Sequence, residues 1–134
     1  MYLEALNDKE KELFLSLAYN LSAADKDYSP EERITISSYC REMGIDFDMS
    51  KIDLSVDKVL DEMDSICSTQ MKRIIVFEAM RLTLADLDYD DDERDILNKA
   101  IEKFGLGKDF HDKCESLINE FIALQEKLNE LIIE

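Results

Sequence analysis

Residues 75–106 read IVFEAMRLTLADLDYDDDERDILNKAIEKFGL, and residues 14–45 read FLSLAYNLSAADKDYSPEERITISSYCREMGI. The two stretches align without a gap at an offset of 61 residues, so that Gly44 falls opposite Gly105. In each stretch, apolar residues recur at intervals of three and four on both sides of an acidic segment, which is typical of two amphipathic helices joined by a turn. The sequence therefore predicts an internal duplication of a unit made of a helix, an acidic turn and a second helix.

The residues that begin and end the predicted helices support this interpretation. Ser29 is a typical N-cap, Pro30 suits the first helical position, and Glu32 completes a capping box. Gly44 and Gly105 are suited to the left-handed conformation that ends many helices. Each copy of the unit thus has a defined second helix.

Further helices complete the predicted bundle. The stretch from about Ser68 to residue 85 is apolar almost all the way round, which is typical of a central, buried helix. A shorter helix is expected from about Ser55 to Met63, and a long last helix from about Lys108 onward. Three glycines and one proline argue against a turn-rich β fold. We expect one all-α domain over residues 1–134, a bundle of about six to seven helices.

Composition and charge exclude several classes of partner. The chain has 134 residues and a formal net charge of −16, which repels nucleic acid and anionic membranes and favours cations or a basic protein partner. No apolar run reaches the ~18 residues that span a membrane, and no secretory signal pattern is present at the N-terminus. The three cysteines show no CxxC spacing. A cytoplasmic protein with reduced thiols is expected.

The last predicted helix carries apolar residues at alternating steps of four and three, a heptad pattern. These residues are Phe110, Cys114, Leu117, Phe121, Leu124, Leu128 and Leu131. We expect this stripe to pack back on the bundle. The alternative is a homodimer formed through the C-terminal helix.

Both acidic turns offer carboxylates that could hold a hard divalent cation, Ca²⁺, Mg²⁺ or Mn²⁺, through oxygen ligands. The candidate metal ligands are Asp25, Asp27, Glu32, Asp86, Asp88 and Glu93. The alternative is that these residues cap helices and interact with the positive ends of the helix dipoles. An EF-hand does not fit, because Pro30 and Ile36 stand where its loop needs Gly and a bidentate Glu.

Catalytic and cofactor-binding patterns are missing from the sequence. There is no glycine-rich phosphate loop and no Ser-His-Asp set, and the one histidine, His111, has no obvious orienting partner. His111 and Cys114 have the spacing of two ligands on one helix face, but no second pair completes a zinc site. Cys114 is expected to be a core residue. We therefore expect a protein that is not an enzyme and has no catalytic residues.

The repeated turn carries a family resemblance. Residues 24–33 and 85–94 both follow Ala-Asp-x-Asp-Tyr-x-x-[Asp/Glu]-Glu-Arg, and an all-helical chain of this length with two such turns resembles the tellurite-resistance TerB-like family. The residue after the first aspartate, usually Gly in that family, is Lys26 or Leu87 here.

The resemblance implies a compact bundle of about seven helices in a cytosolic stress-response system, with a divalent-metal role for the acidic residues. It favours a binding or adaptor module in which the acidic turns could hold a divalent cation. A purely structural or protein-interaction domain without metal is the alternative.

Overall fold

The computed structural model describes residues 1–23, 30–85 and 91–133, and within these ranges it contains helices and no strands. The helices are α1 (Asp8–Ala23), α2 (Pro30–Met43), α3 (Val56–Ile66), α4 (Thr69–Ala85), α5 (Asp91–Phe104) and α6 (Gly107–Ile133), with two 3-10 helices, η1 (Leu3–Ala5) and η2 (Met49–Lys51). The predicted all-α bundle of six to seven helices is confirmed.

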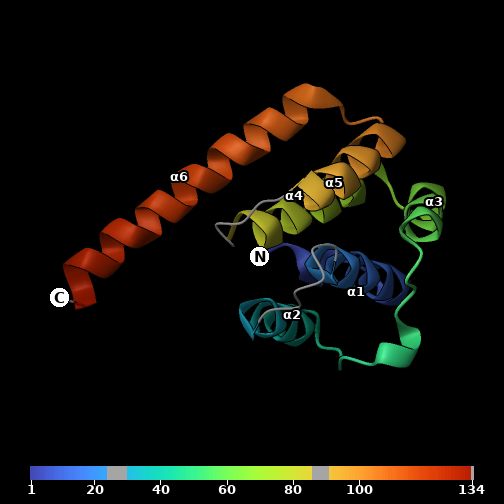
Figure 1. Cartoon of the computed structure of the whole chain (residues 1–134), viewed down its shortest axis with the longest axis horizontal. Helices are drawn as coiled ribbons and strands as arrows, with labels where there is room; N and C mark the ends of the chain where they lie inside the picture. The colour runs from blue at the N-terminus through green and yellow to red at the C-terminus, as the bar shows by residue number, and fades with distance from the viewer. Residues whose placement is uncertain (24–29, 86–90, 134) are drawn as a thin grey trace.

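Helix α4 lies at the centre of the bundle. It packs against α1, α5, α6 and η1. Figure 1 shows α4 behind α5, with α1 on one side and α6 on the other. Its side chains are buried on several sides of the helix, at Ile75, Val76, Glu78, Ala79, Met80, Leu82 and Thr83. This agrees with the all-round apolar character of its sequence.

The helices of the two repeated stretches have matching limits. α2 and α5 begin and end at the same offset of 61 residues that aligns the sequences. Gly44 and Gly105 have φ angles of +70° and +67°. In both stretches, the glycine N–H donates to the carbonyl three residues earlier and the next N–H to the carbonyl five residues earlier. Both helices thus end in a Schellman motif. The duplication itself stays a prediction.

The starts of α1, α3 and α4 are fixed by polar side chains. Before α1, the Glu10 N–H donates to the Asn7 side chain and the Asn7 N–H donates to the Glu10 carboxylate, both at 2.9 Å, which is a reciprocal capping box. Ser55 and Ser68 each accept from the backbone N–H three residues later. The predicted starts near these two serines are confirmed.

Helix α6 packs on the body against α4 and α5, and its last buried or half-buried side chain among the described residues is Ile122. Figure 1 shows its second half extending past the other helices. The side chains that face the body follow steps of four: Phe110 and Ile122 are half-buried, and Cys114 and Ile118 are buried. The expectation that the heptad stripe packs back on the bundle is therefore wrong beyond Cys114.

Candidate functional site

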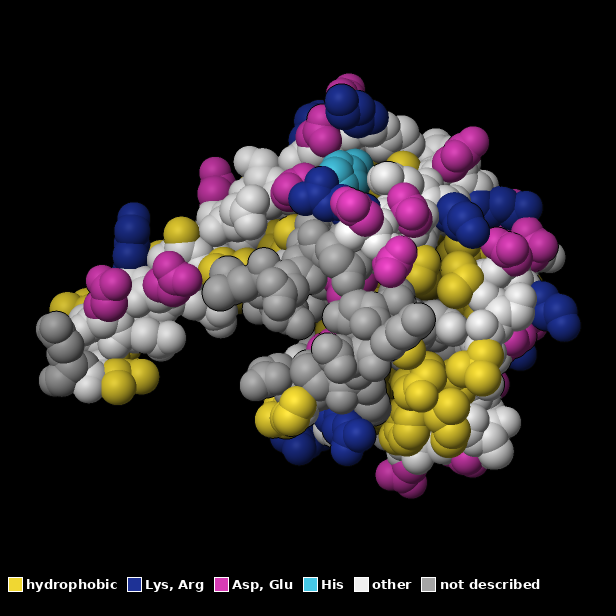
Figure 2. All heavy atoms as spheres, in the orientation of Figure 1, with side chains coloured by type: hydrophobic (Ala, Val, Ile, Leu, Met, Phe, Trp, Pro, Cys, Tyr) yellow, Lys and Arg dark blue, Asp and Glu magenta, His cyan; other side chains and the backbone are white. Residues whose placement is uncertain are grey.

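The heptad stripe that leaves the body is exposed. We call Leu117, Phe121, Leu124, Leu128 and Leu131 the α6 seam; their exposed fractions lie between 38% and 79%. The seam is displaced round the helix from the row that contacts α4 and α5. Figure 2 shows hydrophobic side chains along α6 out to its free end, between charged ones. Large apolar surfaces of this kind mark interaction sites.

The start of the seam forms one wall of a groove, and α4 forms the other. We call this the α4–α6 groove, with a volume of about 470 Å³. Its main walls are Arg73, Ile74 and Phe77 of α4 and Phe110, Leu117 and Phe121 of α6. Tyr2 lies at its edge, with its ring edge-on to Phe77 at 5.7 Å between centroids. The groove can hold apolar side chains of a partner.

A buried ion pair anchors the junction of α4 and α6. The Glu78 side chain is 0% exposed, and the Arg81 guanidinium donates to its two oxygens at 3.1 and 3.3 Å. The same guanidinium lies 6.0 Å from the ring centroid of Phe121, a cation–π distance. Arg81 therefore neutralises a buried carboxylate and holds the groove wall.

Behind this pair, Tyr39 of α2 reaches α4. Its hydroxyl donates to the Glu78 carbonyl at 3.1 Å, and its ring lies edge-on to Phe14. Burial raises the pKa of Tyr39, so the hydroxyl stays a proton donor. In the sequence, a single acidic residue within an apolar stretch was the available signal for Glu78, and it was missed.

The structure places two of the six predicted metal ligands. Glu32 and Glu93 occupy the third positions of α2 and α5, and both are buried. Asp25, Asp27, Asp86 and Asp88 lie outside the described residues. Burial of a carboxylate is costly unless other groups compensate its charge, and the N-terminal turn of a helix supplies part of that compensation.

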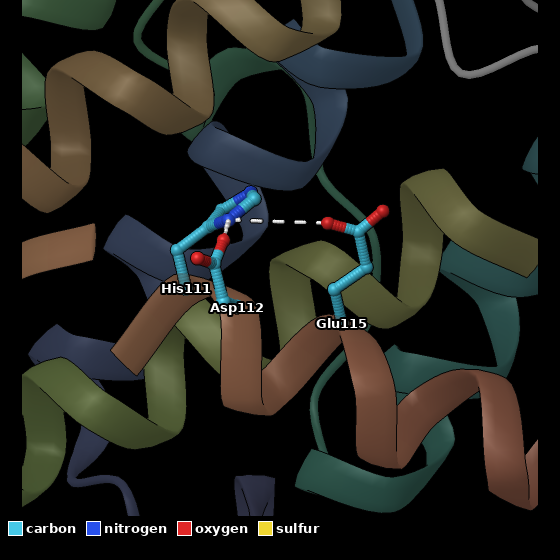
Figure 3. Close-up of side chains that lie close together, drawn as sticks. All are labelled: His111, Asp112 and Glu115. Carbon is cyan, nitrogen blue, oxygen red and sulfur yellow. Dashed lines mark hydrogen bonds and ion pairs between the residues drawn. The ribbon is translucent and has the colours of Figure 1, made fainter. Parts of the chain in front are cut away.

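A second group of metal-type ligands lies at the start of α6, where the sequence suggested His111 with Cys114. Cys114 instead points into the core. Figure 3 shows His111 beside Asp112 and Glu115, with Nδ1 at 3.0 and 3.9 Å from their carboxylate oxygens. These three ligand atoms come from one turn at the start of α6, in which Asp112 is exposed and His111 and Glu115 are half-buried. A structural zinc site needs four, so the group fits a surface ion pair.

The cysteines are unsuited to nucleophilic chemistry. Cys40, Cys67 and Cys114 are all buried and free, and burial raises the pKa of each thiol. For Cys67, burial together with the Glu10 carboxylate raises the pKa to about 12. Because the thiolate is the reactive form, these side chains act as core residues.

Comparisons with known proteins found no matching family model, no similar curated protein and no similar solved structure. Within the part of the chain that the structure describes, no helix is long and apolar enough to cross a membrane.

Proposed function

We propose that this chain is a non-catalytic protein-binding module that receives a helix of its partner in the α4–α6 groove and along the α6 seam. The observation that carries the proposal is the continuity of this apolar surface, from the groove walls to Leu131 near the end of α6. Apolar side chains repeated at steps of three and four match the way one helix binds another.

Crosslinking from inside the groove tests this function. Benzoylphenylalanine in place of Leu117, which is exposed in the groove wall, would capture a bound protein on irradiation. The matched control carries the same group in place of Lys51, an exposed residue of η2 on another part of the surface. In cells that produce the chain, we expect a protein adduct from position 117 and none from position 51. Absence of any adduct from position 117 would refute the function.

The setting we propose is a cytosolic stress-response system of the TerB-like type. Support comes from the two acidic turns at residues 24–33 and 85–94, whose pattern resembles that family. With a net charge of −16, the chain favours a partner with a basic rim around its apolar helix. Binding of such a partner should weaken as salt is added.

A divalent cation is the second candidate ligand. The specific observation in its favour is that Glu32 and Glu93, at equivalent positions of the repeated stretches, are both buried. Bound Ca²⁺, Mg²⁺ or Mn²⁺ at the acidic turns would offset crowded negative charge. In this proposal, the other ligands of the cation are Asp25, Asp27, Asp86 and Asp88.

Thermal unfolding tests the cation. After treatment with a chelator, the protein is unfolded with each ion at constant ionic strength, beside the Asp25→Asn/Asp86→Asn variant. An ion at a hundredfold excess over its Kd stabilises the native state by ~2.7 kcal/mol, which raises Tm by several degrees. A shift with one divalent ion that disappears in the variant supports a metal site. Equal curves for all ions leave helix capping as the role of the turns.

A further inference from the structure

We propose that the helix received by the groove is α6 of a second copy of this chain, in an antiparallel homodimer. The inference rests on the proposed function and names its partner. In a single copy, the distal half of α6 is exposed, and the groove beside its proximal half is open. One molecule therefore carries both the exposed helix and the open groove that would receive the same helix of a second molecule, as a twofold symmetric pair requires.

The geometry of α6 separates contacts within one copy from contacts between copies. The row that packs on the body has steps of four, from Phe110 to Ile122. The α6 seam has steps of four and three, which keep one stripe facing a partner helix. Because the two rows lie side by side on the helix, a second helix can follow the seam while α4 and α5 keep their contacts. Leu117 and Phe121 belong to both the seam and the groove wall.

An antiparallel pair of seams places their side chains in matched layers. With the crossing point between Phe121 and Leu124, Leu117 of one copy lies opposite Leu128 of the other, and Phe121 lies opposite Leu124. Leu131 of the second copy then falls at the level of Cys114, where Phe110 and Leu117 line the groove. The end of each α6 thus enters the groove of the other copy.

The charges beside the seam select this register. Lys113, Glu120 and Lys127 flank the seam at intervals of seven on one side, and all three are exposed. In the antiparallel register above, Glu120 of each copy faces Lys127 of the other. A slide of one heptad in one direction pairs Lys127 with Lys127, and in the other direction Glu120 with Glu120. Like charges in those positions are unfavourable.

A parallel pair would gain nothing from these charges. The positions that flank the other side of the seam are Ile118, Gln125 and Ile132, none of which is charged. In a parallel coiled coil these positions would face Lys113, Glu120 and Lys127. The antiparallel arrangement is therefore the one with complementary charge.

The apolar surface is large enough for a dimer. With roughly 200 Å² for a fully exposed residue of this size, the exposed fractions of the seam and Ile132 leave about 500–700 Å² in each copy. A standard interface buries ~800 Å² per partner, and the groove walls on α4 supply the difference.

Sedimentation equilibrium measures the association directly. The chain has a mass of 15.6 kDa, so we expect a concentration-dependent species of twice that mass. Leu124→Glu places a carboxylate in the middle of the seam and should leave a monomer in which helices α1 to α5 stay folded. Asn119→Glu, an equal charge change on the opposite, exposed face of α6, should leave the dimer intact. A chain that stays monomeric up to the highest concentration, or a dimer that survives Leu124→Glu, overturns the inference.

A charge exchange tests the register. Glu120→Lys puts like charges at both flanking pairs and should weaken association about five- to thirtyfold. Adding Lys127→Glu restores opposite charges and should restore most of the affinity. Failure of the double variant to recover overturns this register. Added salt distinguishes a second copy of this chain from a basic protein partner. It screens the repulsion between two copies of charge −16 and should strengthen the dimer, whereas it should weaken the binding of a basic partner.

The crosslinking experiment separates failure of this inference from failure of the proposed function. A product of twice the chain mass from position 117 supports the dimer. A product with a different protein, together with a monomeric chain in sedimentation, refutes the dimer and leaves the protein-binding function standing. No product and a monomeric chain refute both.

Discussion

Removal of the Arg81 guanidinium should expose the cost of burying Glu78. Breaking a fully buried ion pair by removing one partner costs about 3–5 kcal/mol. Arg81 is 27% exposed at its side chain, so water compensates part of the loss, and we expect Arg81→Met to lower the free energy of unfolding by about 2–3 kcal/mol. Glu78→Gln keeps the shape and removes the charge, and should cost about 1 kcal/mol.

The double variant Glu78→Gln/Arg81→Met contains the decisive comparison. Without the buried charge, the guanidinium is no longer needed, so we expect the double variant to be more stable than Arg81→Met alone. The coupling should be about 1–2 kcal/mol, measured by urea unfolding at one low protein concentration. The α-amino group of Met1, 4.0 Å from Glu78 Oε2, is present in every variant. Losses that add within about 0.5 kcal/mol would refute the account of the pair.

Three further predictions follow from single sites. Gly105→Ala and Gly44→Ala should each lower the free energy of unfolding, measured in urea, by about 1–2 kcal/mol, because an L residue is strained at the positive φ of these positions. No neighbour stands within 4 Å of the added Cβ, so a steric clash adds nothing to this loss. The Cys67 thiol, whose pKa is about 12, should resist a disulfide reagent at pH 8 until the protein unfolds. The Lys72 ammonium donates to the Asp64 carboxylate and lowers the pKa of that carboxyl. The resulting stabilisation is present above the unfolded pKa of about 3.9 and disappears as pH falls through the lower folded pKa. The Tm of Asp64→Asn should therefore fall less steeply on acidification than the Tm of the unaltered protein.

The helices could be predicted from the sequence because local signals agree with the final packing. Gly44 and Gly105 end their helices, and Pro30 begins α2 at its first position. The central position of α4 followed from its apolar character alone. The capping box of Asn7 and Glu10 was equally visible in the sequence, but no interpretation was attached to it.

The surface that carries the proposed function could not be read in the same way. A heptad stripe shows that residues such as Leu124 and Leu128 need a partner, but the spacing does not say whether that partner belongs to the same chain. In the structure, Ile118 and the row around it take the contacts with α4, which leaves the seam exposed. The groove depends on the angle between α4 and α6, a property of packing and not of local sequence.

The length of α6 has a consequence for how the chain becomes ordered. Its 27 residues correspond to ~40 Å of helix, and isolated helices of the length of its distal half are marginal in water. In one copy, residues 123–133 are all exposed within the part of the chain that the structure describes, so their amide hydrogens should exchange with solvent rapidly when the chain is dilute. As the chain becomes more concentrated, pairing should slow that exchange in the last turns, while exchange in α4 stays as it was. The amount of this protein in the cell would then set the fraction of molecules in which the last turns of α6 are helical.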